Sequence, residues 1–134
     1  MKIEIHIFTK ISQNWWGWEI INQYLKRIWQ KWKIKVVQHK NPPVELKGYN
    51  ILLDQRGKEL STEEFAETLE KLEYMEKLNF IIGGPYGVDK KWKDSVDLVV
   101  SMSKMTFPHQ LSLIILVEQL YRTYTILSGH PYHH

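Results

Sequence analysis

Three short stretches of glycine and small polar residues each follow an apolar run, and together they could form a ligand pocket. They are Leu53–Gly57, Gly83–Gly87 and Met102–Phe107. Glycine lets a ligand come close to the backbone, whose N–H and C=O groups can hydrogen bond to it. The second stretch lacks the G-x-G-x-x-G spacing, and no P-loop lysine follows it, so a nucleotide pyrophosphate is not indicated. Turn glycines are usually structural, and only the three stretches together favour a pocket.

A second group of reactive side chains lies toward the end of the chain. Arg122, Tyr132 and His133 are side chains that could move a proton or stabilise a developing anion. Arg122 could equally pair with Glu118, four residues earlier on the same helix. For His109, at the start of that helix, a structural role is favoured over catalysis.

The histidines of the last few residues also suggest a zinc site. His130, His133 and His134 have no carboxylate close in sequence, and the chain contains no Cys. With neither cysteine nor carboxylate nearby, and on a terminal tail, a zinc site is disfavoured, so we predict no metal site.

The composition is that of one folded domain. The 134 residues carry a formal charge of +3 and predict a single domain, 1–134, with one core. Basic residues outnumber acidic ones up to residue 60, and the reverse holds afterwards. This fits either a polyanionic partner or a solvated lysine-rich surface. The six Trp, seven Tyr and four Phe favour a core or an oligomer interface over a platform for stacking bases.

Nothing in the sequence indicates a membrane or secreted protein. The opening Met1–Ile5 alternates charged and aliphatic residues instead of forming the apolar segment of a signal peptide. The longest apolar run, Leu113–Val117, is too short to cross a bilayer. We therefore expect a cytoplasmic protein without a membrane partner.

Hydrophobic periodicity predicts strands that alternate with helices. The expected strands are Lys2–Phe8, Ile34–Gln38, Tyr49–Leu53, Phe80–Ile82 and Asp97–Val100. The expected helices are one capped by Asn14 and continuing to Lys33, one from a capping box at Ser61 and Glu64 to about Lys77, a short one at Asp89–Ser95, and one from Pro108 to Gly129.

This alternation predicts an α/β fold with a mostly parallel sheet and helices on both faces. Asp54–Gly57 is expected to be a turn after the third strand. The crossover between the second and third strands is shortened, because Pro42–Gly48 leaves no room for a normal helix. In a parallel sheet the carboxyl ends of the strands share one edge, so the three glycine and polar stretches should converge there.

Four motifs in the second half of the chain support a resemblance to a known family. They are Gly83-Gly-Pro-Tyr-Gly87, Ser101-Met-Ser-Lys-Met-Thr-Phe-Pro-His109, Glu118-Gln-Leu-Tyr-Arg122 and His130-Pro-Tyr-His133. In this respect the chain resembles the SPOUT-class methyltransferases that modify N3 of a pseudouridine in bacterial 23S ribosomal RNA. The resemblance runs from about Tyr49 to the C-terminus and is most specific in the last third.

The resemblance implies a C-terminal trefoil knot, S-adenosylmethionine as cofactor, a homodimer packed partly through the last helix, and ribosomal RNA, in the assembled ribosome, as substrate. By motif position, the cofactor would contact Leu53, Gly83, Met102, Ser103, Lys104, Met105, Thr106 and Phe107. The Pro-Tyr-His ending would lie at the active site of the neighbouring protomer, so the catalytic candidates are Arg122, Tyr132 and His133.

Two expectations concern the dimer. Leu111, Ile114, Val117 and Tyr121 form the expected dimer seam, because the last helix is apolar around more of its circumference than one sheet face covers. The rival hypothesis is a knotted, RNA-binding homodimer that binds S-adenosylmethionine weakly or not at all and has no turnover. The basic first half and the trimmed crossover favour that rival.

Overall fold

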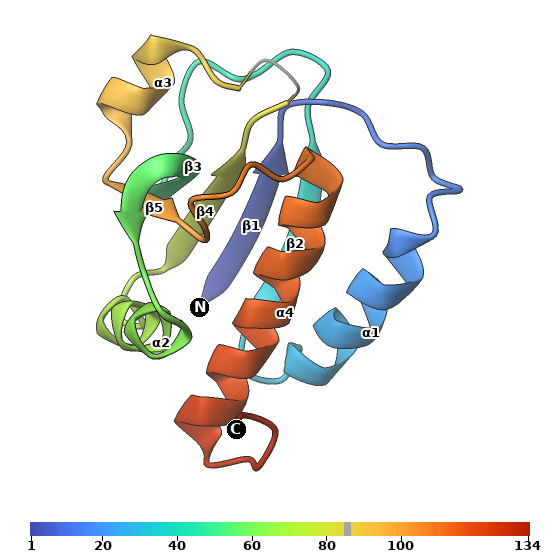
Figure 1. Ribbon diagram of the computed structural model, residues 1–134, viewed down its shortest axis with the longest axis vertical. Helices are drawn as coiled ribbons and strands as arrows, with labels where there is room; N and C mark the ends of the chain where they lie inside the picture. Colours follow the sequence, from blue (N-terminus) through green and yellow to red (C-terminus); the bar gives the residue numbers. More distant parts are fainter. Residues whose placement is uncertain (85–86) are drawn as a thin grey trace.

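The computed structural model describes residues 1–84 and 87–134, which form a five-stranded parallel sheet with helices around it (Figure 1). The strands are β1 (Lys2–Ile7), β2 (Lys33–Gln38), β3 (Tyr49–Glu59), β4 (Lys77–Ile82) and β5 (Leu98–Ser101), in the spatial order β2-β1-β4-β3-β5. The helices are α1 (Gly17–Ile28), α2 (Thr62–Lys71), α3 (Lys90–Ser95) and α4 (His109–Ser128). Every strand pair is parallel, which confirms the predicted fold class.

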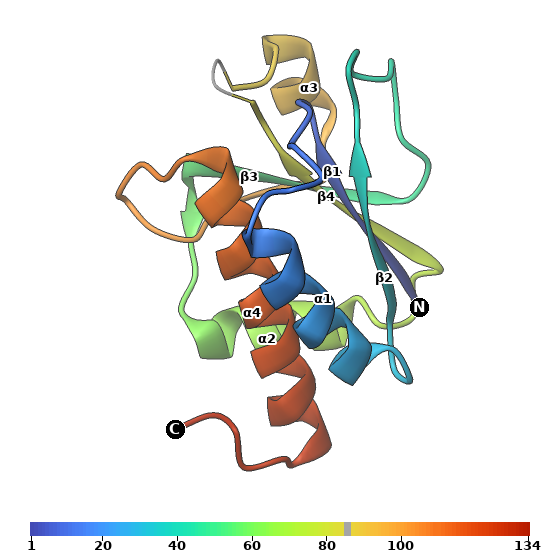
Figure 2. The same cartoon turned by 90° about the vertical axis from the view of Figure 1, so that its right-hand side faces the viewer.

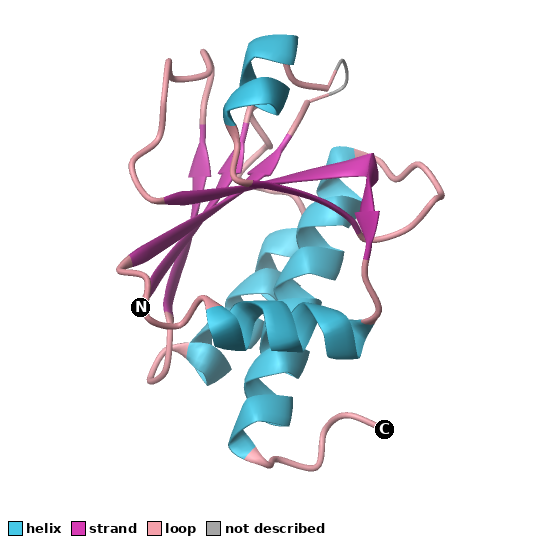
Figure 3. Ribbon diagram, turned by 90° about the vertical axis from the view of Figure 1, so that its left-hand side faces the viewer, coloured by secondary structure: helices cyan, strands magenta, loops and turns pink. Residues whose placement is uncertain are grey.

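The sheet is covered unequally on its two faces (Figure 3). On one face α1, α2 and α4 pack over a large core, to which β1 contributes Ile3, Ile5 and Ile7, all fully buried. On the other face α3 is the one helix among the described residues, and its Trp92 packs on Leu52 and Ile81. Helices on both faces were predicted and are confirmed. No helix in the described ranges has both the length and the apolar character needed to cross a bilayer.

The connection between β2 and β3 contains no helix, as the prolines predicted. Residues 39–48 must cross the sheet, because β1 and β4 lie between the two strands they join. They cross it on the α3 side, where Leu46 packs against the cluster of Leu52, Ile81 and Trp92. Asn79, on β4, is fully buried and holds this segment in place. Its Nδ2 donates to the carbonyl oxygen of Lys47 and to Oδ1 of Asn50, both at 2.9 Å.

Two histidines complete this polar cluster. His6 is buried on β1, and its Nε2–H donates to Oδ1 of Asn79 at 3.0 Å, so its Nδ1 accepts from Nε2 of His39 at 2.8 Å. Burial lowers the pKa of both histidines below the usual value of 6.5. Hydrogen bonds of two neutral imidazoles and Asn79 therefore fix the β2–β3 connection to the sheet, in the absence of a crossover helix.

The start of α1 differs from the prediction. Asn14 does not cap the helix, which begins at Gly17 without a side-chain cap. Instead the edge of the Trp15 ring meets the Trp18 ring, with centroids 5.5 Å apart, and the Trp18 indole N–H donates to the Ser12 carbonyl. These contacts hold residues 12–16 in a turn, so aromatic packing overrides the capping preference of asparagine.

The two long predicted helices of the first half end earlier than expected. The first ends at Ile28, before the predicted Lys33, because the chain turns through the buried Trp32 to enter β2. α2 stops at Lys71 instead of about Lys77, since Lys77 already pairs with β1 as the first residue of β4. The capping box of α2 is confirmed by two hydrogen bonds between Ser61 and Glu64, at 2.9 and 3.1 Å.

Candidate cofactor cavity and C-terminal cluster

A cavity of about 730 Å³ lies beside the middle of β3, the ends of β4 and β5, and the start of α4. Its walls come from the three stretches that the sequence predicted to converge, so that prediction is confirmed. The lining residues are Leu53, Asp54, Gln55, Arg56, Ile82, Gly83, Gly84, Gly87, Met102, Ser103, Met105, Thr106, Phe107, Pro108, His109 and Ser112. Lys104 is the one predicted cofactor contact that does not line it.

The first wall is part of a strand, where a turn was expected. β3 continues through Asp54–Gly57 to Glu59, with a register shift against β5 between Leu53 and Lys58. A Cβ on Gly57 would lie 2.7 Å from the Val99 side chain, so glycine serves a close strand contact there. The bulge carries Asp54–Arg56 into the cavity wall, and these residues were missing from the predicted contacts.

The second wall is the glycine loop after β4. A Cβ built on Gly83 would lie 2.7 Å from the backbone carbon of Gly87. Gly84 and Gly87 also form an isolated antiparallel bridge. Gly83 is therefore needed because two backbone segments approach each other beside the cavity, and not because it leaves space for a ligand. Pro85 and Tyr86, part of the predicted motif, lie outside the described residues.

The third wall is the loop between β5 and α4, and hydrogen bonds of two serines, Ser101 and Ser103, stabilise its conformation. Ser101 donates its hydroxyl to the carbonyl of Ser103 at 2.7 Å, and Oγ of Ser103 accepts from the backbone N–H of Met105 at 3.0 Å. Thr106 hydrogen bonds to Gln55, which lines the cavity from β3. The loop thus presents Met105, 73% exposed, at the rim.

The first turn of α4 forms the fourth wall of the cavity. Pro108 occupies the N-cap and makes no side-chain cap, so the first N–H groups of the helix have no capping side chain. A helix N-terminus carries partial positive charge and suits a carboxylate or another anion. His109 and Ser112 lie on the same turn at the cavity wall.

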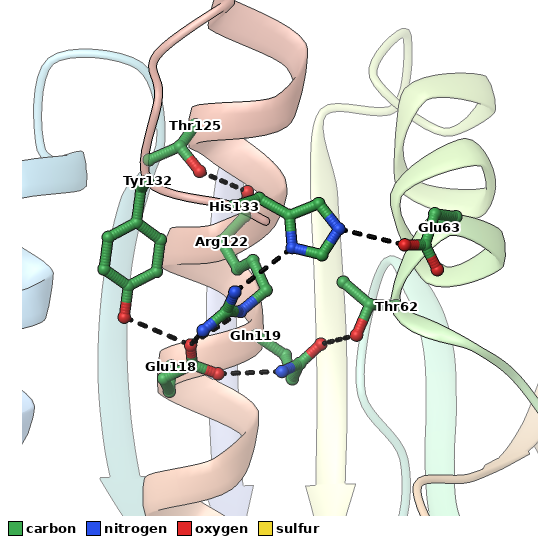
Figure 4. Close-up of polar contacts among 8 residues, drawn as sticks. All are labelled: Thr62, Glu63, Glu118, Gln119, Arg122, Thr125, Tyr132 and His133. Carbon is green, nitrogen blue, oxygen red and sulfur yellow. Dashed lines mark hydrogen bonds and ion pairs between the residues drawn. The ribbon is translucent and has the colours of Figure 1, made fainter.

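The three catalytic candidates lie at the other end of α4 (Figures 1 and 2). Gly129 ends the helix with a φ of +72°, and the tail turns back along it. Arg122 donates from Nε and Nη2 to Oε1 of Glu118, at 2.8 and 2.7 Å, and Tyr132 donates its hydroxyl to the same oxygen at 3.2 Å. The predicted Arg122–Glu118 pair is confirmed, and it belongs to a larger network (Figure 4).

His133 joins this network to α2. Its Nδ1 lies 3.1 Å from Nη1 of Arg122, and its Nε2 lies 2.9 Å from Oε1 of Glu63. Sequence reasoning missed Glu63, because the contact spans 70 positions. The Arg122 guanidinium also stacks over the Tyr132 ring at 4.7 Å from its centroid.

The phenol of Tyr132 keeps its proton in this environment. Contact with the Tyr24 hydroxyl, partial burial and the Glu118 carboxylate raise the pKa of Tyr132 to about 12. Tyr132 is therefore a hydrogen-bond donor at neutral pH and not a base. The Glu118 carboxylate likewise raises the pKa of Arg122, which stays a cation.

A single chain does not bring this cluster to the cavity. Arg122 follows His109 along a single helix, and a rise of 1.5 Å per residue separates the two by about 20 Å. The structure therefore joins the predicted cofactor contacts into one site and the predicted catalytic residues into another. Among residues 1–84 and 87–134, no group of three His, Cys, Asp or Glu side chains is placed to hold a metal ion.

Comparison with known proteins decides the family. A profile described as "Predicted SPOUT methyltransferase" matches residues 1–133. The chain belongs to this family. Its five parallel strands and flanking helices agree with membership.

Several curated relatives are named "Ribosomal RNA large subunit methyltransferase H". The one from Bacteroides fragilis is 52% identical over 86 residues, which cover 63% of this chain and only 55% of that relative. The one from Acetivibrio thermocellus is 35% identical over 159 aligned positions, with 99% of both chains covered. The one from Francisella tularensis subsp. novicida is 41% identical over 108 residues, covering 80% of this chain and 68% of the relative.

Proposed function

We propose that this SPOUT protein is an S-adenosylmethionine-dependent methyltransferase that acts on N3 of a pseudouridine in 23S ribosomal RNA. The observation that carries the proposal is the cavity between β3, the ends of β4 and β5, and α4, in a chain whose relatives are named for methylation of large-subunit ribosomal RNA. The specific base and the cofactor follow from the resemblance of the C-terminal motifs.

The cavity fits S-adenosylmethionine in size and chemistry. Its volume of about 730 Å³ lies within the range of roughly 300–1,000 Å³ that is usual for small-molecule sites. Leu53, Ile82, Met102 and Phe107 offer apolar wall, and the loop backbone offers hydrogen-bonding groups. The uncapped first turn of α4 suits the carboxylate of the methionyl group. When bound, this cofactor supplies a methyl group activated on a sulfonium.

The side chains at the far end of α4 have the properties that the target base requires. N3–H of pseudouridine is weakly acidic, so methylation needs a base or a cation that stabilises the anion. His133 is the candidate base, and Arg122 is the candidate cation for the anion or for a phosphate. Tyr132 keeps its proton and would orient the pseudouridine ring by donating a hydrogen bond to it.

The proposal includes a homodimer in which the tail of one protomer completes the cavity of its partner. A separation of about 20 Å along α4 requires either such a partner or a large movement of the tail. Val117 and Tyr121, two residues of the expected seam, are buried in the protomer core. Leu111, 43% exposed, and the half-buried Ile114 are left to form the seam. A C-terminal trefoil knot, action on the assembled ribosome and a cytoplasmic location complete the proposal.

The test is transfer of a radiolabelled methyl group to ribosomes that lack the modification, followed by mapping of the labelled nucleotide. We expect stoichiometric labelling at one pseudouridine of 23S RNA. If the protein binds ribosomes but transfers no label, the rival hypothesis of an RNA-binding dimer without turnover replaces this one.

A further inference from the structure

The contacts of His133 define which of its nitrogens carries the proton. A guanidinium can only donate, so Nδ1 of His133 must accept from Nη1 of Arg122 at 3.1 Å. In the neutral ring, Nε2 then carries the hydrogen and donates it to Oε1 of Glu63 at 2.9 Å. The His133 hydrogen bond lowers the pKa of Glu63, which is thus the ionised partner of a carboxylate–imidazole pair.

Glu63 is held where it can act on the tail. It lies in the first turn of α2, beside the capping box. The neighbouring Thr62 donates its hydroxyl to Oε1 of Gln119 at 2.9 Å, which ties this turn to α4 (Figure 4). Glu118 is not available for the same task, because its oxygens already accept from Arg122, Tyr132 and Gln119.

We propose that Glu63 is a positioning residue for methyl transfer: it holds the Nε2–H form of His133, so that Nδ1 becomes the proton acceptor when Arg122 turns away to the RNA. This inference rests on the proposed function. It resembles the way in which the carboxylate of a hydrolase triad fixes the tautomer of its histidine. In the structure Arg122 covers Nδ1, so the cluster is in a resting arrangement.

The step balances in protons and electrons. The N3–H proton of the pseudouridine moves to Nδ1 of His133, and N3 keeps the electron pair. N3 then bonds to the methyl carbon while the carbon–sulfur bond breaks and leaves its pair on sulfur. His133 ends the step as an imidazolium, with the Glu63 carboxylate 2.9 Å from Nε2 to stabilise it.

Steady-state kinetics of Glu63 variants test whether this residue contributes to methyl transfer. Glu63→Gln should lower kcat about tenfold or more, which is part of the roughly 10²–10⁴-fold that general-base help contributes, with KM for ribosomes unchanged. Glu63→Asp should recover part of the rate. In a His133→Ala background, Glu63→Gln should cause no further loss. The matched control is Glu67→Gln, an exposed glutamate one turn along α2, which should behave as wild type. Equal kcat for Glu63→Gln and Glu67→Gln would overturn the proposal.

The tautomer can be measured without activity, by NMR of protein with ¹⁵N-labelled histidine, with His133→Gln used for assignment. Arg122→Leu removes the donor to Nδ1, and His133 should remain in the Nε2–H form because Glu63 still accepts from it. Adding Glu63→Ala should then release the ring to a tautomer mixture. A mixture already present in Arg122→Leu would contradict the proposed role of Glu63. Absence of methyl transfer by wild type would contradict the proposed function instead, and the tautomer measurement would then decide the inference alone.

Discussion

The two ends of α4 differ in how their polar groups are used. At the N-terminal end, loop backbone and an uncapped helix turn surround an open cavity. At the C-terminal end, charged and aromatic side chains satisfy one another in a closed network through Arg122 and Glu118. The first arrangement suits binding of a ligand by shape and backbone, and the second suits proton and charge chemistry. Neither end alone contains both the candidate cofactor cavity and the candidate catalytic residues.

The largest expected effect comes from breaking the cavity end alone. In Gly83→Val, the side chain meets the Gly87 backbone, since even a Cβ would lie 2.7 Å from it. The loop must shift, and we expect S-adenosylmethionine binding to fall below detection in calorimetry. Circular dichroism should still show a folded protein, and the network at the other end should be unaffected. If Gly83→Val bound S-adenosylmethionine normally, the Gly83 loop would be a structural turn and not part of the cofactor site.

Breaking the other end should affect chemistry and leave binding intact. Deletion of residues 132–134 removes the Tyr132 contact with Tyr121, whose ring centroids are 4.7 Å apart, and the His133 bonds. We expect methyl transfer to fall by at least about a hundredfold, the scale for loss of positioning or general-base help. Cofactor affinity should stay near wild type, and the melting temperature should fall by only a few degrees.

A purely structural tail would give the opposite pattern in the same three measurements. The melting temperature would then fall strongly, and transfer and cofactor affinity would be lost in proportion. Undiminished transfer would remove the tail from the mechanism and leave Arg122 as the remaining candidate.

The smallest effect concerns a polar cluster that belongs to neither end. Burial lowers the pKa of His6 and His39 below 6.5, so the unfolded chain binds protons more readily than the folded one. Stability should be full above pH 6.5 and should decline as the pH falls from there through the lowered values. In thermal melts between pH 7 and 5, His39→Gln should flatten this decline. His130→Gln, on the exposed tail, should not, and an unchanged slope for both would contradict the assignment.

The sequence predicted the cavity end better than the tail end, for a physical reason. Strand ends of a parallel sheet converge by topology, so local signals at Leu53, Gly83 and Met102 were sufficient to locate the cavity. The partner of His133 lies 70 residues away, at Glu63, and no local pattern encodes such a contact.

Errors in the predicted elements also came from contacts that local propensity does not contain. The rings of Trp15 and Trp18 displaced the expected Asn14 cap. Pairing with β5 extended β3 through the expected turn at Asp54–Gly57. In both places tertiary packing overrides a preference that is correct for an isolated segment.

In the proposed homodimer, a working site combines the cavity of one protomer with the tail of its partner. This arrangement can be tested by co-expressing Gly83→Val and the 132–134 deletion with two different affinity tags and purifying the mixed dimers through both. Each parent homodimer should be nearly inactive. The mixed dimer should regain about half of wild-type transfer, because one of its two composite sites is intact. If each site lay within a single protomer, both copies would remain defective, and a mixed dimer without activity would contradict the account.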